Sequence, residues 1–227
     1  MRVLRIIGSG AVAFYDELFF FMMLGLINLL SWILIIPGPF AMAGIYTVGQ
    51  QSVRTKGVNW PMIWDGIKEY GPRSLLLFFI IVAVYGVIGI NLWFYLNPDI
   101  SPFPASVAVW TTPIFIFFGV IWTGVAFYAQ SLLMELQEPT MVLVLRNSLF
   151  LTILQPVQTL VLLIVTLLSL ALSIALPVLL IVWPGFVCCL SLTAARQLIT
   201  DLTERAEAKG LAEKGVDEEE EDSRDAR

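Results

Sequence analysis

Long stretches without a charged side chain dominate the pattern of polar and apolar positions along this chain. They cover residues 18–53, 74–98, 100–134 and 147–195, which are 36, 25, 35 and 49 residues long. A helix needs about 20 apolar residues to cross the hydrocarbon core of a bilayer, so each stretch can hold one crossing and the longest can hold two. The pattern predicts four long membrane spans, at residues 74–97, 106–130, 149–172 and 177–195.

The first stretch is interrupted by Pro37-Gly38-Pro39. Two prolines remove two backbone donors and restrict the residues before them, so a helix must break there. Residues 18–36 are long enough for a slightly short span. Residues 39–53 extend only about 22 Å at 1.5 Å per residue, against a hydrocarbon core of about 30 Å. We expect that segment to be either a short returning pass or a helix at the membrane surface.

The predicted fold class is an all-α, polytopic helical membrane bundle over residues 1–200, with five to six membrane segments. Lys and Arg prefer the cytoplasmic side of membrane proteins. If residues 39–53 stay at the surface, the 13 basic residues divide 2 to 11 between outside and inside, whereas a returning pass places all 13 inside. The rule favours the returning hairpin, with both termini in the cytoplasm.

A separate amphipathic segment precedes the span at residues 74–97. Trp60, Trp64 and Tyr70 alternate there with charged residues, after a Pro61 suited to the first turn of a helix. Amphipathic aromatic rings prefer the headgroup region of a bilayer. The pattern therefore predicts a short helix that lies in the membrane interface.

Charge is concentrated at the C-terminal end of the chain. Of the 227 residues, 58% are hydrophobic and 14% charged, and the last 27 hold 11 of the 18 Asp and Glu and five of the 13 Lys and Arg. The first 200 keep seven acidic and eight basic side chains, too few to cover the surface of a soluble domain. Residues 201–227 predict an acidic, disordered cytoplasmic tail beyond a helical extension to about Lys209.

The residue types that most enzymes need are scarce in this chain. It has no histidine and two cysteines, the adjacent Cys188 and Cys189, so it offers neither a spaced disulfide framework nor a zinc ligand set. No glycine loop for phosphate is present either. We expect no enzymatic activity, no cofactor, no metal and no nucleic-acid partner. Cys188 and Cys189 suit packing better than palmitoylation.

Four amide side chains fall inside the predicted spans: Asn28, Asn91, Gln155 and Gln158. Polar groups in hydrocarbon are costly unless paired, which makes these four candidates for function. Gln155 and Gln158 flank Pro156, which frees the carbonyl four residues earlier. The four amides either hydrogen-bond between helices, which is the commoner role, or line a polar path for a substrate.

Charged side chains gather at the expected cytoplasmic ends of the spans: Glu135, Glu138, Arg146 and Arg196. Glu135 and Glu138 are three residues apart and share a helix face. These four residues form either a docking patch for a partner protein or a set of solvated helix ends.

Five short segments occur in an order that is typical of a known family. They are YDELF (15–19), NLLSW (28–32), IPGPFAMAGIY (36–46), YAQ (128–130) and LRNSL (145–149). In this order the chain resembles the YesL-like (DUF624) family of bacterial integral membrane proteins, over most of residues 12–200. That family has an aspartate before the first helix, an Asn-Leu-Leu-Trp-like core and an Arg-Asn-Ala-like triplet that opens a later helix. Ser31 and Ser148 depart from this pattern without disturbing the architecture.

The resemblance implies a bacterial plasma-membrane protein that assists carbohydrate uptake, since family members are encoded beside carbohydrate transporters and glycan-degrading enzymes. It implies transporter subunits or further copies of the chain as partners, besides the lipid bilayer, and it supplies no catalytic or binding residues. We expect a non-enzymatic accessory component of carbohydrate uptake or of another membrane transport complex. The alternatives are a small transporter or channel that uses the four amides and, more weakly, a lipid-binding membrane protein.

Overall fold

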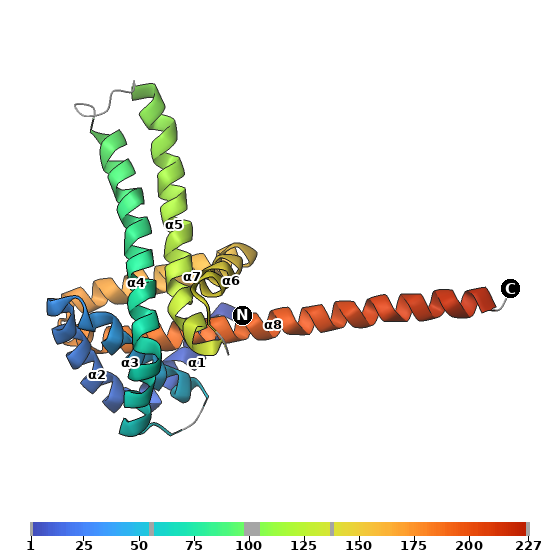
Figure 1. Ribbon diagram of the computed structural model, residues 1–227, viewed down its shortest axis with the longest axis horizontal. Coiled ribbons are helices and arrows are strands. Elements are labelled where there is room, and N and C mark those ends of the chain that lie inside the picture. The colour runs from blue at the N-terminus through green and yellow to red at the C-terminus, as the bar shows by residue number, and fades with distance from the viewer. Residues whose placement is uncertain (1, 55–56, 98–104, 137–138, 226–227) are drawn as a thin grey trace.

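Helices account for almost all of the computed structural model, which describes residues 2–54, 57–97, 105–136 and 139–225. In chain order they are α1 (Arg2–Asp16), α2 (Leu18–Ser31), the 3₁₀ turn η1 (Trp32–Leu34), α3 (Pro37–Val53), α4 (Trp60–Leu96), α5 (Ala105–Glu135), α6 (Met141–Leu154), α7 (Pro156–Ala175) and α8 (Val178–Asp225). No strand occurs among the described residues. The predicted all-α fold is confirmed (Figure 1).

Four of the described helices are long and apolar enough to cross a membrane. They are Trp60–Leu96, Val107–Glu135, Pro156–Ala175 and Val178–Asp201, and the bent pair of α1 and α2 brings the number of spans to at most five. Large apolar side chains such as Ile90, Phe117 and Leu167 are more than half exposed on these helices. An apolar surface of this extent belongs in lipid. The chain is therefore a multi-pass membrane protein.

The span predicted at residues 149–172 is wrong in its position, because the chain breaks inside it. α6 ends at Leu154, Gln155 leaves the helical region with φ −132° and ψ 66°, and Pro156 starts α7. Pro156 has no N–H to continue the hydrogen bonds of α6, and its ring disfavours a helical conformation in the residue before it. The apolar span is α7 alone, residues 156–175.

The interfacial helix predicted before residue 74 is not separate from the span that follows. Both belong to the single 37-residue α4, which passes through Pro72 without a break. Asn59 caps this helix by accepting the backbone N–H of Met62 at 3.0 Å. One lost backbone hydrogen bond does not end a helix whose other turns remain bonded. The first turns of α4 therefore extend beyond its apolar part.

Residues 18–36, predicted as one span, form the shorter α2 followed by η1. α2 has 14 residues, or about 21 Å, and the length of a span is reached only together with α1, across a bend of 85°. Residues 32–36, which follow α2, are all apolar and 38–75% exposed. α3 then returns in contact with α2. This part of the chain is a short helical hairpin with an apolar tip.

α3 lies in the middle of the bundle, in contact with α1, α2, α4, α5 and α8. Twelve of its 17 residues are buried, so this helix lies inside the bundle and not on its outer face. Small residues allow this burial, because Gly66 of α4 packs against Thr47 and Gly49 packs against Cys188 of α8. Close approach of this kind is how helices in lipid gain van der Waals contact.

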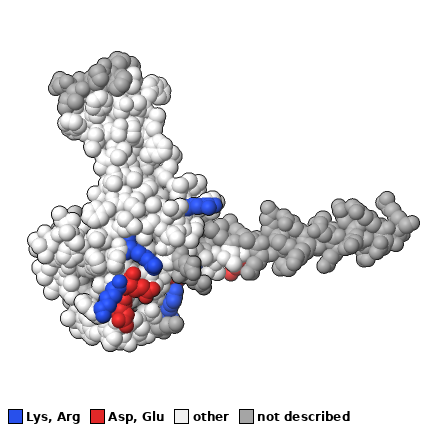
Figure 2. Space-filling view, viewed as in Figure 1, with Lys and Arg blue, Asp and Glu red and all other residues white. Residues whose placement is uncertain are grey.

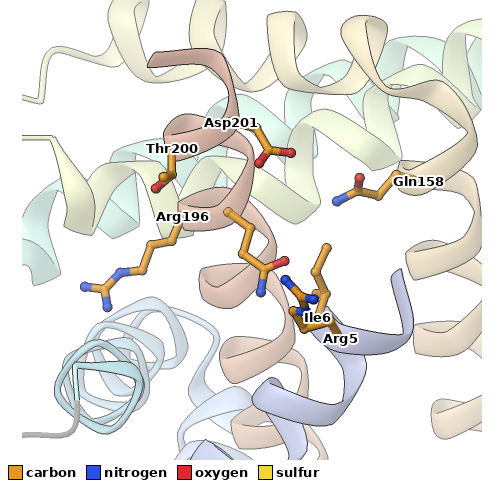
Figure 3. A pocket seen from close by; sticks show the side chains of 7 residues that line it. Arg5, Ile6, Gln158, Arg196, Thr200 and Asp201 are labelled. Carbon is orange, nitrogen blue, oxygen red and sulfur yellow. The ribbon is translucent and has the colours of Figure 1, made fainter. Parts of the chain in front are cut away.

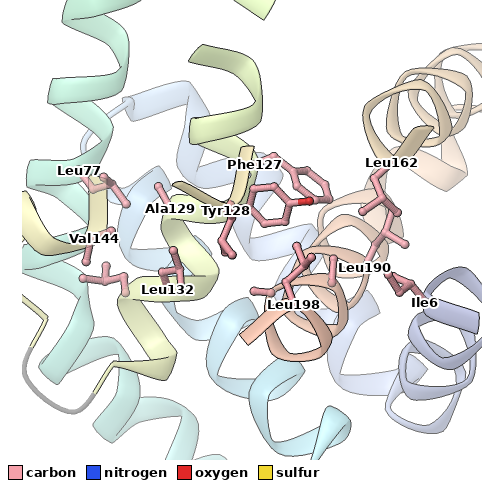
Figure 4. Packing of buried hydrophobic residues seen from close by; sticks show 14 residues of the cluster. Ile6, Leu77, Phe127, Tyr128, Ala129, Leu132, Val144, Leu162, Leu190 and Leu198 are labelled. Atoms are coloured by element: carbon pink, nitrogen blue, oxygen red, sulfur yellow. The ribbon is translucent and has the colours of Figure 1, made fainter. Parts of the chain in front are cut away.

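α4 and α5 form a hairpin that rises from the rest of the molecule, while α7 and α8 run across its base (Figure 1). The larger buried cluster joins the helices near this crossing. It includes Tyr128 and Leu132 of α5, Leu190 and Leu198 of α8, and Ile6 of α1 (Figure 4). Of the most apolar 18-residue segment of α4, only 11% is buried. The core thus lies where the helices cross, and lipid covers the upper hairpin.

α8 continues as a helix to Asp225, whereas the sequence predicts a disordered tail after about Lys209. Figure 1 shows this end projecting away from the other helices. Ala, Glu, Lys, Arg and Leu make up most of residues 204–214, and all five have high intrinsic helix propensity. These residues cannot form an apolar core, which is why the sequence predicts disorder. Their intrinsic propensity nevertheless favours a helix.

Gly25→Ala should destabilise the bundle. A Cβ atom at this position would collide with the backbone carbonyl of Ile181 in α8, and a backbone atom cannot rotate away. We expect a loss of about 1–3 kcal/mol in the free energy of unfolding, measured as a lower melting temperature in detergent. Gly86→Ala is the control, because nothing lies within 4 Å of its Cβ position and alanine favours a helix. Equal melting temperatures would contradict the close α2–α8 contact.

Ile35→Gly should raise the melting temperature. Ile35 has φ 62° and ψ −57°, and the N–H of Ile36 donates to the carbonyl of Leu34 at 2.7 Å, which is the geometry of a strained γ-turn. Strain of this kind costs about 1–3 kcal/mol, more than the roughly 0.5–1 kcal/mol that glycine loses in chain entropy. Ile33→Gly, in η1, should bring no gain. A lower melting temperature for Ile35→Gly than for Ile33→Gly would disprove the strain.

Candidate functional site

Glu135 lies between two arginines that come from different helices. Its Oε1 accepts hydrogen bonds from Nε and Nη2 of Arg196 at 3.0 and 2.8 Å, and its Oε2 accepts one from Nη2 of Arg54 at 3.0 Å. The side chain of Glu135 is 11% exposed, against 22% for Arg196 and 37% for Arg54. Charge-assisted hydrogen bonds of this kind are stronger than neutral ones. This bridge, Arg54–Glu135–Arg196, connects α3, α5 and α8 and has one more positive than negative charge.

The ends of two helices explain why these side chains meet. α3 ends at Val53 and α5 ends at Glu135, and the last turn of each helix leaves backbone carbonyls without partners in the helix. The side chain of Gln50 supplies a partner for one of these carbonyls, because its Nε2 donates to the carbonyl of Met134 at 2.6 Å. The negative ends of both helix dipoles also favour guanidinium groups nearby.

Buried hydroxyl groups tie the same three helices together. Ser131 donates to Ser191 at 2.8 Å, Ser191 donates to the carbonyl of Cys188 at 3.0 Å, and the hydroxyl of Tyr46 lies 3.2 Å from that of Ser191. Buried polar groups with partners of this kind fix the packing of helices. Cys188 and Cys189 are fully buried, which agrees with a packing role for both thiols.

The four amides predicted to form a polar path have separate surroundings. Asn91 donates from Nδ2 to the carbonyl of Val87 in its own helix at 2.7 Å. Asn28 is 4% exposed, and its Oδ1 has no partner among the described residues. Gln155 is the break between α6 and α7, and Gln158 is 9% exposed in the first turn of α7. Within the described ranges no hydrogen bond joins any two of them, so the structure does not connect them into one path.

The residues predicted as a docking patch are also brought together only in part. Glu135 and Arg196 are paired, whereas Arg146 lies on α6 with its guanidinium 5.9 Å from the ring centre of Phe150. Glu138 falls outside the described residues. Sequence reasoning missed Arg54, although its position at the end of a charge-free stretch could have indicated it. Arg54 ends the first charge-free stretch as Glu135 ends the third, so both mark a membrane boundary.

A polar cavity of about 360 Å³ lies between α1, α7 and α8 (Figure 3). The residues that line it are Arg5, Ile6, Gln158, Arg196, Gln197, Thr200 and Asp201. Arg196 belongs to the bridge as well, so the cavity and the bridge adjoin. Six of these seven side chains are polar: two arginines, two amides, one hydroxyl and one carboxylate.

A second cavity, of about 490 Å³, lies between α1, α3 and α8 and shares Arg196 and Gln197 with the first. Asp16 and Thr193 also line it, and the hydroxyl of Thr193 has no partner among the described residues. Polar groups therefore line two spaces that border α1.

Charged side chains also gather on the first turns of α4. Asp65, Lys68, Glu69 and Arg73 are exposed there, together with Trp60 and Trp64. Figure 2 shows acidic and basic atoms mixed at the lower end of the molecule, whereas the face of the upper hairpin seen in this view is uncharged. Lys68 Nζ lies 5.7 Å from the ring centre of Trp64, within the range of a cation–π contact. This charged surface belongs to water or to a partner.

Comparison with known proteins gives no relative of this chain. No protein-family model matches it, and no curated protein or solved structure gives a significant match. The resemblance to the YesL-like family stays a prediction that rests on the five segments quoted above. We therefore derive the function from the bridge, the polar cavity and the charged surface of α4.

Glu135→Gln should destabilise the protein more than the loss of an exposed carboxylate does. It leaves Arg196 without the carboxylate that pairs with it and removes one partner of Arg54, in a partly buried site. We expect a loss of about 1–3 kcal/mol, less than for a fully buried pair because both arginines keep contact with water. Asp65→Asn, on the exposed face of α4, should change stability by no more than about 0.5 kcal/mol. Equal melting temperatures for the two variants in detergent would rule out a structural role for the bridge.

Proposed function

We propose that this chain is a non-enzymatic accessory component of a membrane transport complex. It docks on that complex through a surface formed by Trp60, Trp64, Asp65, Lys68, Glu69 and Arg73 of α4. The distribution of basic residues favours a cytoplasmic position for this surface. The resemblance to the YesL-like family favours carbohydrate uptake as the process that the complex serves.

The exposure of two tryptophans beyond the apolar part of α4 carries this proposal. Trp60 is 46% exposed and Trp64 is 59% exposed. Indole rings are typical anchors of protein interfaces, because each buries a large area at a low cost in conformational entropy. The charges of both signs around them favour a partner with a complementary pattern and fix its orientation.

The rest of the bundle supports this surface mechanically. α4 packs along α3, whose C-terminal end is held by the Arg54–Glu135–Arg196 bridge. A binding surface on a helix that is packed in this way loses little freedom when a partner binds. The surface is therefore already ordered before the complex forms.

Site-specific photo-crosslinking in native membranes tests the proposal. A photoreactive phenylalanine analogue in place of Trp64 should crosslink to a membrane subunit of a transporter, identified by mass spectrometry. The same analogue in place of Trp110, which is 76% exposed near the start of α5, is the control and should label lipid. Lipid adducts alone at position 64, together with recovery of a lone monomer in mild detergent, would refute the proposal.

Charge reversal distinguishes docking from membrane anchoring by the same tryptophans. Lys68→Glu should lower the recovery of the transporter subunit about tenfold, because it places a like charge against the partner. Arg146→Glu on α6 is the matched control, since this arginine lies outside the proposed surface, and it should leave the recovery unchanged. An equal loss in both variants would indicate a general effect of charge on the membrane and not a docking surface.

A further inference from the structure

A buried amide points into the polar cavity between α1, α7 and α8. Gln158 is 9% exposed, and its side chain forms no hydrogen bond with another described residue. Figure 3 shows the amide directed from α7 toward the space that Arg5 and Asp201 also face. The amide atoms of Gln158 are not among the enclosed side-chain atoms that lack a partner, so they open onto the cavity. The content of the cavity must therefore supply its hydrogen bonds.

Arg5 brings to this space a side chain that can only donate hydrogen bonds. The guanidinium of Arg5, the amides of Gln158 and Gln197 and the hydroxyl of Thr200 can all donate. None of these four side chains has a hydrogen bond or ion pair with another described residue. Asp201 supplies the one carboxylate of the lining, and it takes part in another interaction as well. Together Arg5 and the bridge outweigh that carboxylate, so the cavity favours an anion.

The N-terminus of α7 strengthens this preference. Gln158 lies in the first turn of this 20-residue helix, and Gln155 at the N-cap position makes no side-chain hydrogen bond to cap it. Pro156 has no N–H and the N–H of Thr159 donates to the carbonyl of Gln155 at 3.0 Å, which leaves the N–H groups of Val157 and Gln158 at the positive end of the helix dipole. Phosphate groups bind readily at such positions.

We propose that this cavity binds the phosphate group of a membrane phospholipid whose headgroup also carries hydroxyl or ammonium donors. Arg5 and Gln158 donate hydrogen bonds to the phosphate oxygens. Asp201, which would repel the phosphate alone, accepts a hydrogen bond from the hydroxyl or ammonium group of the same headgroup. This site does not depend on the proposed docking surface, and each can fail without the other.

Apolar surface beside the cavity favours a lipid over a free phosphate. Leu4, next to Arg5, is 74% exposed, and Val157, next to Gln158, is 73% exposed. Both side chains can lie against acyl chains while the headgroup occupies the polar space. The cavity also lies at the end of the apolar span Val178–Asp201, where the hydrocarbon core gives way to headgroups.

Native mass spectrometry of the full-length protein in detergent tests the site. Phosphatidylglycerol is the probe, phosphatidylcholine is the comparison because its quaternary ammonium cannot donate a hydrogen bond, and glycerol 3-phosphate represents a free phosphate. We expect phosphatidylglycerol to bind about tenfold more tightly than either of the others, which is about 1.4 kcal/mol. Equal binding of the two lipids, or tighter binding of glycerol 3-phosphate, would overturn the proposal.

Substitutions at the cavity separate a specific site from general attraction of charge. Arg5→Gln and Gln158→Glu should each weaken the binding of phosphatidylglycerol about tenfold, the first by removing a cation and the second by placing a carboxylate against the phosphate. Arg146→Gln removes a cation that does not line the cavity and should leave binding unchanged. An equal loss in Arg5→Gln and Arg146→Gln would refute the site. Gel filtration and melting temperatures identify the folded variants, and Arg5→Gln, at an exposed position, decides the case if Gln158→Glu does not fold.

Discussion

Close contact between helix backbones is the constraint on which this bundle depends. In lipid an apolar side chain gains little by leaving its surroundings, so helices hold together through van der Waals contact and polar bonds. α3 meets this condition with small buried residues along its length, among them Ala43, Gly44 and Gly49. In the neighbouring helices, Gly66 packs against Thr47 and Cys188 packs against Gly49. Five helices touch α3, and a larger residue at Gly44 would disturb its contact with α4, whereas one at Gly49 would disturb its contact with α8.

The hydrocarbon core of the bilayer also determines where the charged side chains lie. Ions are excluded from the apolar stretches, so they collect where those stretches end. Arg54 and Glu135 follow the first and third charge-free stretches, and Arg196 follows the fourth. Once the helices are packed side by side, these ends lie together and the bridge forms. Arg196 takes part in the bridge and in the lining of the polar cavity, so a structural contact and a binding site share one cation.

The number and approximate place of the long spans could be predicted, because charge-free length is a property of the sequence itself. The break at Gln155 follows from a local rule for Pro156, but the predicted span crosses it because the prediction divides the stretch of 49 residues only once, between residues 172 and 177. The central position of α3 could not be predicted, since apolar residues look alike whether they face lipid or protein. Gln158 could be predicted as a site residue because it is an amide inside an apolar stretch. Gln197 and Thr200 could not, because polar residues are common at the end of a span.

Gln155 is a single non-helical residue between two helices that pack on different neighbours. α6 lies mainly against α5, α7 lies mainly against α8, and α6 and α7 touch each other little. An apolar cavity of about 200 Å³, lined in part by Thr152 and Pro156, lies between α5 and this joint. α5 is nevertheless held to both α7 and α8, because Tyr128 belongs to the buried cluster that includes Leu190 and Leu198 and its hydroxyl lies 3.3 Å from that of Thr159. One non-helical residue therefore lets a single charge-free stretch cover two different neighbours without a loop between its helices.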